Sequence, residues 1–449
     1  MWRMGKKMER FDLVSHINKN DDGYCVIWLF NIGVERYWNN SYNGVVDIKE
    51  DEVVNHSEEM MLLLARPQDI VIMRRMPNEE YLDELRHCGF SNPQIVCPQS
   101  EDDSKCISEL ILEDLSILRR LKEIGEKDNV VFMPYGVSYF EERIAEMCNL
   151  KMVGGPETKS REINNKLYSR RIAQELGFPI SDGYECRTIK ELTIAYKDLC
   201  KKYDRIIIKM PCNASGKGMW IVEDENRLKT VCMIIKRIIR SNADTVWLVE
   251  GWLDKKIDMN CQIFVTEDGS VEVFSVKEQV TVDTVYIGSV FPPRMTHDQY
   301  DTCQQYAKKI GKYLYEHSFY GLFGIDGLVT TNGTVIPIIE INGRFTLSTY
   351  VSFLNKCFKN KHFFSFYKRV STSKSMDYRI LVSELKKRGV YTDGLKSGLF
   401  LYTSATLDTQ VLGHVIRIFC VACGNTIEET LSLKKKFDMI CTELEIDDL

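Results

Sequence analysis

Short apolar runs alternate with amphipathic segments through the first 150 residues of the chain. The runs have the length of buried strands, and the segments between them carry apolar residues at the i, i+3, i+4 spacing of helices. The predicted strands are Tyr24–Phe30, Asp69–Met73 and Val130–Met133, and the predicted helices are Ser57–Ala65, Asn78–Cys88, Ile107–Ile124 and Ser138–Asn149. Strands that alternate with helices in this way predict a small parallel α/β sheet.

The pattern changes between about residues 155 and 350, where several strands follow one another with few helices between them. The predicted helices are Thr158–Leu176, Ile189–Lys202, Asn226–Arg240 and Thr296–His317. The predicted strands are Arg205–Met210, Met219–Glu223, Val246–Glu250, Asp258–Thr266, Val271–Thr281, Val285–Ser289 and the hairpin Gly321–Ile341. This order predicts an α+β fold with an antiparallel sheet in its second half.

The segment Lys359–Lys374 is basic and shows few of the patterns that indicate a helix or a strand. We interpret it as a crossing segment or a mobile loop. After it the predicted elements are a helix at Tyr378–Lys387, strands at Gly398–Thr403 and His414–Cys423, and a helix at Thr426–Thr442. We therefore expect three parts: an α/β domain over 1–154, an α+β domain over 155–358, and the basic segment with a small α/β appendage over 359–449.

Composition narrows the function classes. A chain of 449 residues is long enough for two or three domains, and its 44% hydrophobic and 27% charged residues are ordinary for a globular protein. No apolar run approaches the roughly 18 residues of a membrane helix. The charged N-terminus lacks the apolar core of a signal peptide, which predicts a cytoplasmic protein without a membrane partner. The net charge of −5 argues against nucleic acid as a partner.

Cysteine and histidine patterns do not indicate a zinc site or a covalent catalyst. The 15 cysteines are scattered along the chain, and we expect most of them to be buried reduced thiols. Cys420 and Cys423 form a CxxC inside a strand-like run, which we read as core. The seven histidines have no partner at ligand spacing.

A glycine-containing loop joins two predicted strands at Cys212–Gly218. Ser215, Gly216, Lys217 and Gly218 would let the backbone approach a phosphate and present N–H groups, a hydroxyl and a charge to it. The loop is not a Walker motif, because the GxxxxGK spacing is absent and a strand follows. An ordinary hairpin turn explains the same residues about as well.

Two lysines are candidates for the same phosphate site. Lys209 ends the apolar run before the loop, and Lys166 lies on the helix that precedes the strands. Two ammonium groups that converge on phosphates would offset their charge. The alternative, which holds for most lysines, is that each is a solvated surface residue.

The segment Trp247–Trp252 is a candidate nucleotide hinge, because an apolar strand ends there in an acid and Asp258 follows shortly after it. Backbone groups around Glu250, Gly251 and Trp252 would contact the adenine edge, and Asp258 would accept from ribose hydroxyls. A strand that ends in a polar turn is an equally good interpretation.

Asp326, Glu340 and Asn342 form the strongest candidate site, since their hard oxygens suit Mg²⁺ held together with phosphates. The two carboxylates can share one side of the hairpin only if its loop has three residues, Thr331–Gly333, with Gly333 in the left-handed position. Asp326 would then face Ile338. A two-residue turn without a bulge would put the carboxylates on opposite sides.

Other charged residues are assigned from position alone. Arg344 either clamps a phosphoryl group or merely forms an ion pair with nearby carboxylates. Arg294 is a second candidate for charge stabilisation. Lys277, Glu278 and Gln279, at the end of a strand, are predicted to line the substrate pocket.

The order of these motifs resembles the ATP-grasp superfamily, and the resemblance covers roughly residues 155–350. It implies an ATP-grasp fold of two α+β subdomains clasping ATP, preceded by a small parallel α/β domain. The run from Asn31–Glu35 to Trp38–Asn40 is similar to peptide ligases of antibiotic pathways and to the butirosin-pathway ligase that loads glutamate onto an acyl carrier protein.

The resemblance also implies roles for the matched residues, with ATP and Mg²⁺ as cofactors. Lys166 and Lys209 would hold the α- and β-phosphates, the 213–218 loop with Lys217 would close over the γ-phosphate, and Glu250 and Asp258 would hold adenine and ribose. Asp326, Glu340 and Asn342 would bind Mg²⁺, and Arg344 would steady the transferred phosphoryl group. One departure is that a ribose ligand of this type is often Glu, and Asp258 stands slightly late after Glu250.

Three functions are consistent with these residues. The first is a ligase that joins an amino-acid or peptide carboxylate to an amine, in a specialised pathway such as antibiotic biosynthesis, with ADP and phosphate as products. The second transfers the activated acyl group to an acyl carrier protein. The third is a nucleotide-binding subunit without turnover. A homodimer is one possible assembly.

Overall fold

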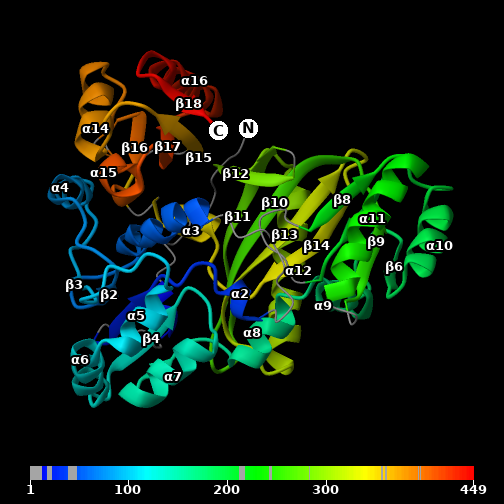
Figure 1. The fold of residues 1–449 in the computed structure, drawn as a ribbon, viewed down its shortest axis with the longest axis horizontal. Helices are drawn as coiled ribbons and strands as arrows, with labels where there is room; N and C mark the ends of the chain where they lie inside the picture. Colours follow the sequence, from blue (N-terminus) through cyan, green and yellow to red (C-terminus); the bar gives the residue numbers. More distant parts are fainter. Residues whose placement is uncertain are drawn as a thin grey trace.

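The computed structural model describes residues 13–17, 23–38, 48–211, 218–241, 245–282, 284–354, 357–358, 362–392, 394 and 396–449. Three sheets organise these residues. Figure 1 shows the blue and cyan N-terminal lobe beside the orange and red C-terminal lobe, with the large green and yellow sheet between them and the small four-stranded sheet.

The N-terminal lobe is a five-stranded sheet in the order β3-β2-β1-β4-β5, with all pairs parallel, as the alternation of strands and helices predicts. The strands are β1 Cys25–Leu29, β2 Ile70–Ile72, β3 Gln94–Val96, β4 Val130–Pro134 and β5 Lys151–Met152. The helices are α1 Leu13–Ile17, α2 Glu35–Trp38, α3 Ile48–Asn55, η1 His56–Leu63, α4 Glu79–His87, α5 Ile107–Glu113, α6 Leu115–Gly125 and α7 Tyr139–Cys148. The predicted single helix at 107–124 is two helices, because the Asp114 side chain accepts from the amides of Ser116 and Ile117 and starts a new helix.

A small antiparallel sheet follows in the order β6-β9-β7-β8. Its strands are β6 Gly183–Cys186, β7 Ile206–Lys209, β8 Met219–Val222 and β9 Trp247–Gly251. The helices of this part are α8 Glu157–Ile163, α9 Lys166–Glu175, α10 Ile189–Leu199 and α11 Glu225–Ser241. Apolar residues of α10 and α11 pack with those of β7 and β9 in one core, which leaves the other side of the sheet to face α9.

The largest sheet has nine strands in the order β14-β13-β10-β11-β12-β15-β17-β16, with β18 paired to β15. The strands are β10 Lys255–Val265, β11 Val271–Val282, β12 Val285–Phe291, β13 Gly321–Thr330, β14 Val335–Asn342, β15 His362–Thr372, β16 Gly398–Leu401, β17 Val415–Gly424 and β18 Ile446–Asp448. The helices are α12 His297–Glu316, α13 Leu347–Val351, α14 Tyr378–Lys387, η3 Ala405–Leu407, α15 Thr409–Leu412 and α16 Ile427–Glu443. The C-terminal strands therefore extend the sheet of the central part.

The interpretation of 359–374 as a crossing segment or mobile loop is wrong for the described residues, because His362–Thr372 is a strand in the interior of the large sheet. The basic residues that suggested a loop are held by acids: Lys368 pairs with Asp438 and Asp448 at 3.1 and 2.9 Å, and Lys374 pairs with Glu445 at 2.9 Å.

Each face of the large sheet has a different character around β10. Met259, Cys261 and Ile263 lie in the apolar core that α12 covers, together with Cys303 and Ile310 of that helix. The residues between them, which include Asn260 and Gln262, are polar and point to the opposite face, as alternation along a strand requires. The polar face of this sheet is therefore where a site can form. Cys420 and Cys423 are fully buried in β17, as expected for core thiols.

Candidate active site

A row of polar side chains crosses four strands of the large sheet. Lys277 of β11 pairs with Asn260 of β10, Asn260 with Asp326 of β13, and Asp326 with Glu340 of β14. Directly paired residues lie on the same face of an antiparallel sheet. The four side chains therefore line the face that α12 does not cover.

The hairpin loop between β13 and β14 is of the predicted three-residue type. The Thr330 amide donates to the Thr334 carbonyl oxygen at 2.9 Å, and Gly333 adopts a φ of +89°. A two-residue turn, which would have separated Asp326 from Glu340, is thereby excluded.

The register beyond the loop differs from the simple expectation that Asp326 faces Ile338. Leu328 pairs with Ile336, but Asp326 pairs with Glu340, so β14 contains two more residues than β13 in this stretch. Pro337 cannot donate to the ladder, and Gly327 permits the close approach, since a Cβ there would lie 2.6 Å from the Ile336 carbonyl oxygen. A shift of two residues keeps each side chain on its face, so the carboxylates still meet.

Three side-chain amides hold the Asp326 carboxylate. Asn260 and Gln279 each donate to Oδ1 at 2.8 Å, and Asn342 donates to Oδ2 at 2.9 Å. Burial and the facing Glu340 carboxylate raise the pKa of Asp326 to about 6, although the amides act in the opposite direction. Two carboxylates that repel each other beside an amide oxygen are a donor set that suits Mg²⁺.

Within the described residues no group of three or more His, Cys, Asp or Glu is gathered in a way that could hold a metal ion. A cation at Asp326 would thus rest on two carboxylates, the Asn342 amide oxygen and oxygens of its ligand. This arrangement is usual for Mg²⁺, which shares its coordination with phosphates and water.

Lys166 is buried and directed at this row. The predicted helix Thr158–Leu176 is broken, because the Asn165 side chain accepts from the Leu167 amide and starts α9 at Lys166. Lys166 Nζ donates to Glu340 Oε1 at 2.8 Å, and its side chain is only 4% exposed, which excludes the solvated alternative.

Lys209 is also buried, at 5%, and its Nζ donates to Glu250 Oε2 at 2.7 Å. Arg170 of α9 donates to the other oxygen of Glu250 at 2.6 Å. Burial alone would raise the pKa of Glu250, but the two cations hold it below its ordinary value. Because Lys166 and Arg170 lie one turn apart on α9, this helix connects the carboxylates of both antiparallel sheets.

Two backbone N–H groups of the predicted hinge Trp247–Trp252 already donate hydrogen bonds within the protein. The Gly251 amide donates to the Asp182 carbonyl oxygen at 3.0 Å, and the Trp252 amide donates to the Arg205 carbonyl oxygen at 2.8 Å. These two N–H groups are used within the protein. In the described turn after β9, Leu253 is the first residue whose amide donates to no other protein group.

Asp258 lies at the hinge end of β10, on the same face as Asn260. Its Oδ2 accepts from Lys255 Nζ at 2.5 Å and from Thr281 Oγ1 at 2.9 Å. The structure thus brings Asp258 to the polar face, beside the hinge and two strand positions from the row. Its predicted contact with ribose stays a prediction.

The predicted phosphate loop falls mostly outside the described residues. Ser215, Gly216 and Lys217 belong to the segment 212–217, which the structure does not describe. Gly218 is described: it has a φ of +72°, and its carbonyl oxygen accepts from the Met210 amide at 2.9 Å. The loop therefore joins the end of β7, where Lys209 lies, to the start of β8.

Arg344 joins the row to the N-terminal lobe. Its guanidinium forms an ion pair with Glu35, donates to the Tyr135 hydroxyl at 3.2 Å and lies over the Tyr135 ring. Burial alone would lower the pKa of Arg344, but the Glu35 carboxylate raises it above its ordinary value. Glu35 and Tyr135 follow the neighbouring parallel strands β1 and β4.

Arg294 is not brought to the row. Its guanidinium and backbone amide bind the Glu278 carboxylate, with an Nε–Oε1 distance of 3.0 Å. Glu278 pairs with Met259 and therefore points to the face that α12 covers. Of the three predicted pocket residues only Lys277 and Gln279 point to the polar face.

Three site residues were missed from the sequence: Asn260, Gln262 and Arg170. Gln262 Nε2 donates to Asn260 Oδ1 at 2.7 Å, so it supports the amide that holds Asp326. A signal for the first two was present, since polar and apolar residues alternate strictly from Asp258 to Ile263. Arg170 follows Lys166 by four residues and gave no comparable signal.

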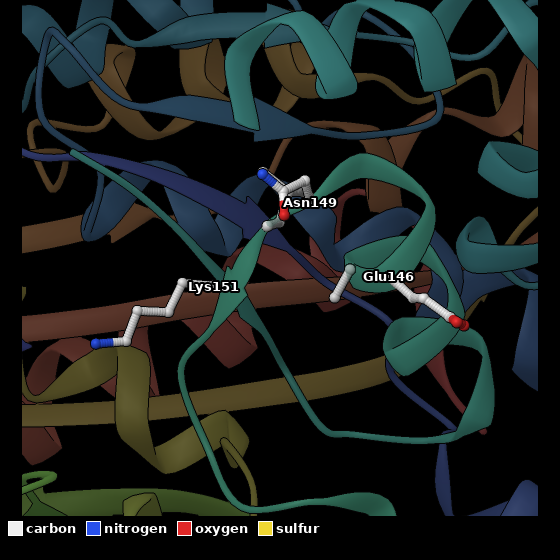
Figure 2. A pocket seen from close by; sticks show the side chains of 5 residues that line it. Glu146, Asn149 and Lys151 are labelled. Carbon is white, nitrogen blue, oxygen red and sulfur yellow. The ribbon is translucent and has the colours of Figure 1, made fainter. Parts of the chain in front are cut away.

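A separate pocket of about 490 Å³ lies at the C-terminal end of α7 and is lined by Ala145, Glu146, Asn149, Leu150 and Lys151. Figure 2 shows the Glu146 and Lys151 side chains pointing in opposite directions, away from a common centre. Lys151 instead pairs with Glu267 at 2.8 Å. This pocket shares no residue with the polar row.

Comparison with known proteins places two domains on the chain. Residues 171–352 match the ATP-grasp domain family, and residues 58–150 match the pre-ATP-grasp domain family. A curated relative is the [butirosin acyl-carrier protein]–L-glutamate ligase of Niallia circulans, which is 28% identical over 338 residues. The alignment covers 74% of this chain and 74% of the relative.

Solved structures share the fold at low sequence identity. The ADP complex of an N5-carboxyaminoimidazole ribonucleotide synthetase is 14% identical, with a TM-score of 0.57 over 94% of this chain and 98% of that one. A biotin carboxylase complex from Campylobacter jejuni is 15% identical, with a TM-score of 0.58 over 94% and 92%. Within the described residues, no helix is both long and apolar enough to span a membrane.

Proposed function

Because the chain carries an ATP-grasp domain preceded by a pre-ATP-grasp domain, we propose that it is an ATP-dependent carboxylate ligase that activates its substrate as an acyl phosphate. The observation that carries this proposal is the meeting of Asp326, Glu340 and Asn342 on one face, with Lys166 bonded to Glu340. A paired-carboxylate site next to buried lysines suits the phosphates of Mg-ATP.

The nucleotide would lie between the two antiparallel sheets that α9 connects. Lys209 and Lys166, which bond to Glu250 and Glu340 in this structure, would turn towards the phosphates. Leu253 would offer a backbone N–H to the adenine edge, and Asp258, at the hinge end of β10, would accept from the ribose hydroxyls. Lys217 and Ser215 would approach the γ-phosphate from the loop after β7.

Asp326, Glu340 and Asn342 would hold Mg²⁺, which offsets negative charge on the phosphates when it is bound. The substrate carboxylate oxygen would attack the γ-phosphorus, and the bond to the ADP oxygen would break. A nucleophile would then attack the acyl carbon and release phosphate. Arg344, which contacts Glu35 and Tyr135, would steady the transferred group. A protein nucleophile is not required.

The relative of this chain favours a carrier-protein acceptor. Its name describes the ligation of L-glutamate to a butirosin acyl-carrier protein, and it aligns over 74% of both chains. We therefore place amino-acid loading of an acyl carrier protein, in an antibiotic-type pathway, ahead of amide formation with a free amine. The non-catalytic alternative is disfavoured, since Lys209, Asp326, Glu340 and Asn342 are all present.

A nucleotide-product assay tests the proposal. The protein is incubated with Mg-ATP and pooled amino acids, with and without a phosphopantetheinylated carrier protein. We expect ADP and phosphate, with carrier-dependent stimulation and a mass increase of the carrier by one acyl group. Release of AMP and pyrophosphate would refute the acyl-phosphate mechanism. Full activity with a free amine and no carrier protein would show that the enzyme forms an amide.

The matched variant for this assay is the Asp326→Ala, Glu340→Ala double substitution. It should abolish ADP release, whereas Arg294→Ala, which removes the ion pair on the other face of β11, should retain most of it. The homodimer and the cytoplasmic location stay predictions. Light scattering on the purified protein measures the first of them.

A further inference from the structure

Lys277 is a buried cation at the end of the polar row. Its residue exposure is 1%, and Nζ donates to the Ser348 carbonyl oxygen at 2.6 Å and to the Ser352 hydroxyl. Both partners are neutral. Because an ammonium group has three donors, one donor is not used by any described residue.

A buried ammonium without a carboxylate partner is costly, and proteins seldom retain one without a functional reason. Every other buried lysine of the described site has an acid: Lys166 has Glu340 and Lys209 has Glu250. No described carboxylate lies within ion-pair distance of Lys277. Burial accordingly lowers the pKa of Lys277 to about 7.

Lys277 lies on the same face of the sheet as Asp326, at the opposite end of the row from Glu340. It stands two strands from Asp326, which is about 10 Å at the usual strand spacing. Asn260 lies between them, donating to Asp326 Oδ1 at 2.8 Å and accepting from the Ser348 hydroxyl at 3.1 Å. The phosphates of the nucleotide are proposed to bind at the other end of the row, beside Asp326 and Glu340. A small acid placed between Lys277 and that end would touch both.

Further donors surround this end of the row. The Tyr286 and Ser289 hydroxyls lie 2.9 Å apart, and Ser289 Oγ is 3.4 Å from Ser348 Oγ. The cluster therefore joins one cation to several hydroxyl groups and contains no acid among the described residues. This is the composition of an anion subsite.

We propose that Lys277, beside the Ser348–Ser352 turn, is the subsite for a carboxylate of the acyl-donor substrate. The assignment rests on the proposed ligase function, because it takes the anion to be the substrate of the same site. The competing reading is structural: Lys277 would only tie α13 to β11 through Ser348 and Ser352.

The experiment uses the full chain and two kinds of ligand. Apparent affinity is measured by thermal-shift titration with L-glutamate, L-aspartate, succinate and acetate at constant ionic strength, and separately with Mg-ADP. The variants are Lys277→Met, Ser352→Ala and Lys308→Met. Ser352→Ala keeps the ammonium but removes a partner, and Lys308 is an exposed lysine of α12 on the other face.

For Lys277→Met we expect at least about tenfold weaker binding of the carboxylates that stabilise the wild type, and unchanged Mg-ADP binding. Lys308→Met should match the wild type, and Ser352→Ala should retain most carboxylate binding. In turnover, Lys277→Met should raise KM for the acid while leaving KM for ATP in place, a split that a purely structural role would not produce.

The proposal is overturned if none of the four acids binds the wild type more tightly than Lys277→Met. It is also overturned if Lys277→Met weakens carboxylate and Mg-ADP binding equally, because that is the effect of a disturbed α13. Failure of Mg-ADP to bind the wild type would instead count against the proposed ligase function, and the carboxylate titrations would still decide the role of Lys277.

Discussion

Replacing Lys277 by methionine should change how the stability of the protein depends on pH. The folded pKa of about 7 and the ordinary value of 10.5 differ by about 3.5, which at ~1.4 kcal/mol for each pH unit is about 5 kcal/mol. The folded pKa is the lower one. The unfolded chain therefore binds the proton more tightly, and Lys277 destabilises the fold most at and below pH 7. This penalty falls as the pH rises towards 10.5.

Methionine removes the penalty but also the two hydrogen bonds of Lys277 to Ser348 and Ser352, each worth about 1 kcal/mol. The variant should thus be about 3 kcal/mol more stable than the wild type near pH 7. Its advantage should shrink by ~1.4 kcal/mol for each pH unit above 7, because only the wild type gains stability from this titration.

Urea unfolding of both proteins between pH 6.5 and 9.5 measures the difference. The slope of that difference with pH is the informative quantity, because all other titrating groups are common to both chains. Parallel curves would refute the reasoning, since they would mean that Lys277 has the same pKa in the folded and unfolded states. If the variant were less stable than the wild type at pH 7, the hydrogen bonds of Lys277 would contribute more to stability than its desolvation costs.

Three further changes test other parts of the site. Asp326→Asn should raise the Mg²⁺ concentration for half-maximal ADP release at least about tenfold, measured by metal titration, because one of two carboxylates is lost. Asn165→Ala should cost ~1 kcal/mol in urea unfolding and raise KM for ATP, since the cap that starts α9 is lost. Glu35→Gln should cost about 2–3 kcal/mol, because Arg344 loses its carboxylate; an unchanged unfolding midpoint would argue that the pair is solvated.

The hairpin was the part of the site that the sequence specified best. The requirement that Asp326 and Glu340 share one side of the hairpin predicted a three-residue loop with Gly333 in the left-handed position, and the structure has that loop. The partner of Asp326 was not predictable, because the two additional residues of β14 depend on how Gly327 accommodates the carbonyl groups beside Pro337. Local pattern fixes the face of a strand but not its register.

Elements whose character depends on distant partners were misread. β15 looked like a loop because Lys368 and Arg369 interrupt its apolar pattern. The acids that neutralise Lys368 are Asp438 of α16 and Asp448 of β18, which follow it by 70 and 80 residues. The break before Lys166 was hidden because the apolar spacing continues from α8 into α9. The Lys277 environment depends on α13, which the pattern did not predict.

The sheet that contains the polar row also contains the C-terminal strands, and this limits how the protein can be divided. A chain ending at residue 358 would leave the edge of β12 unpaired over residues 288–291, where the Phe-rich strand β15 pairs with it. An unprotected strand of this kind is an aggregation site. Residues 359–449, about a fifth of the chain, are therefore unsuited to transplantation or removal as a module. Exchange of substrate preference between relatives would be better attempted by replacing residues around α13.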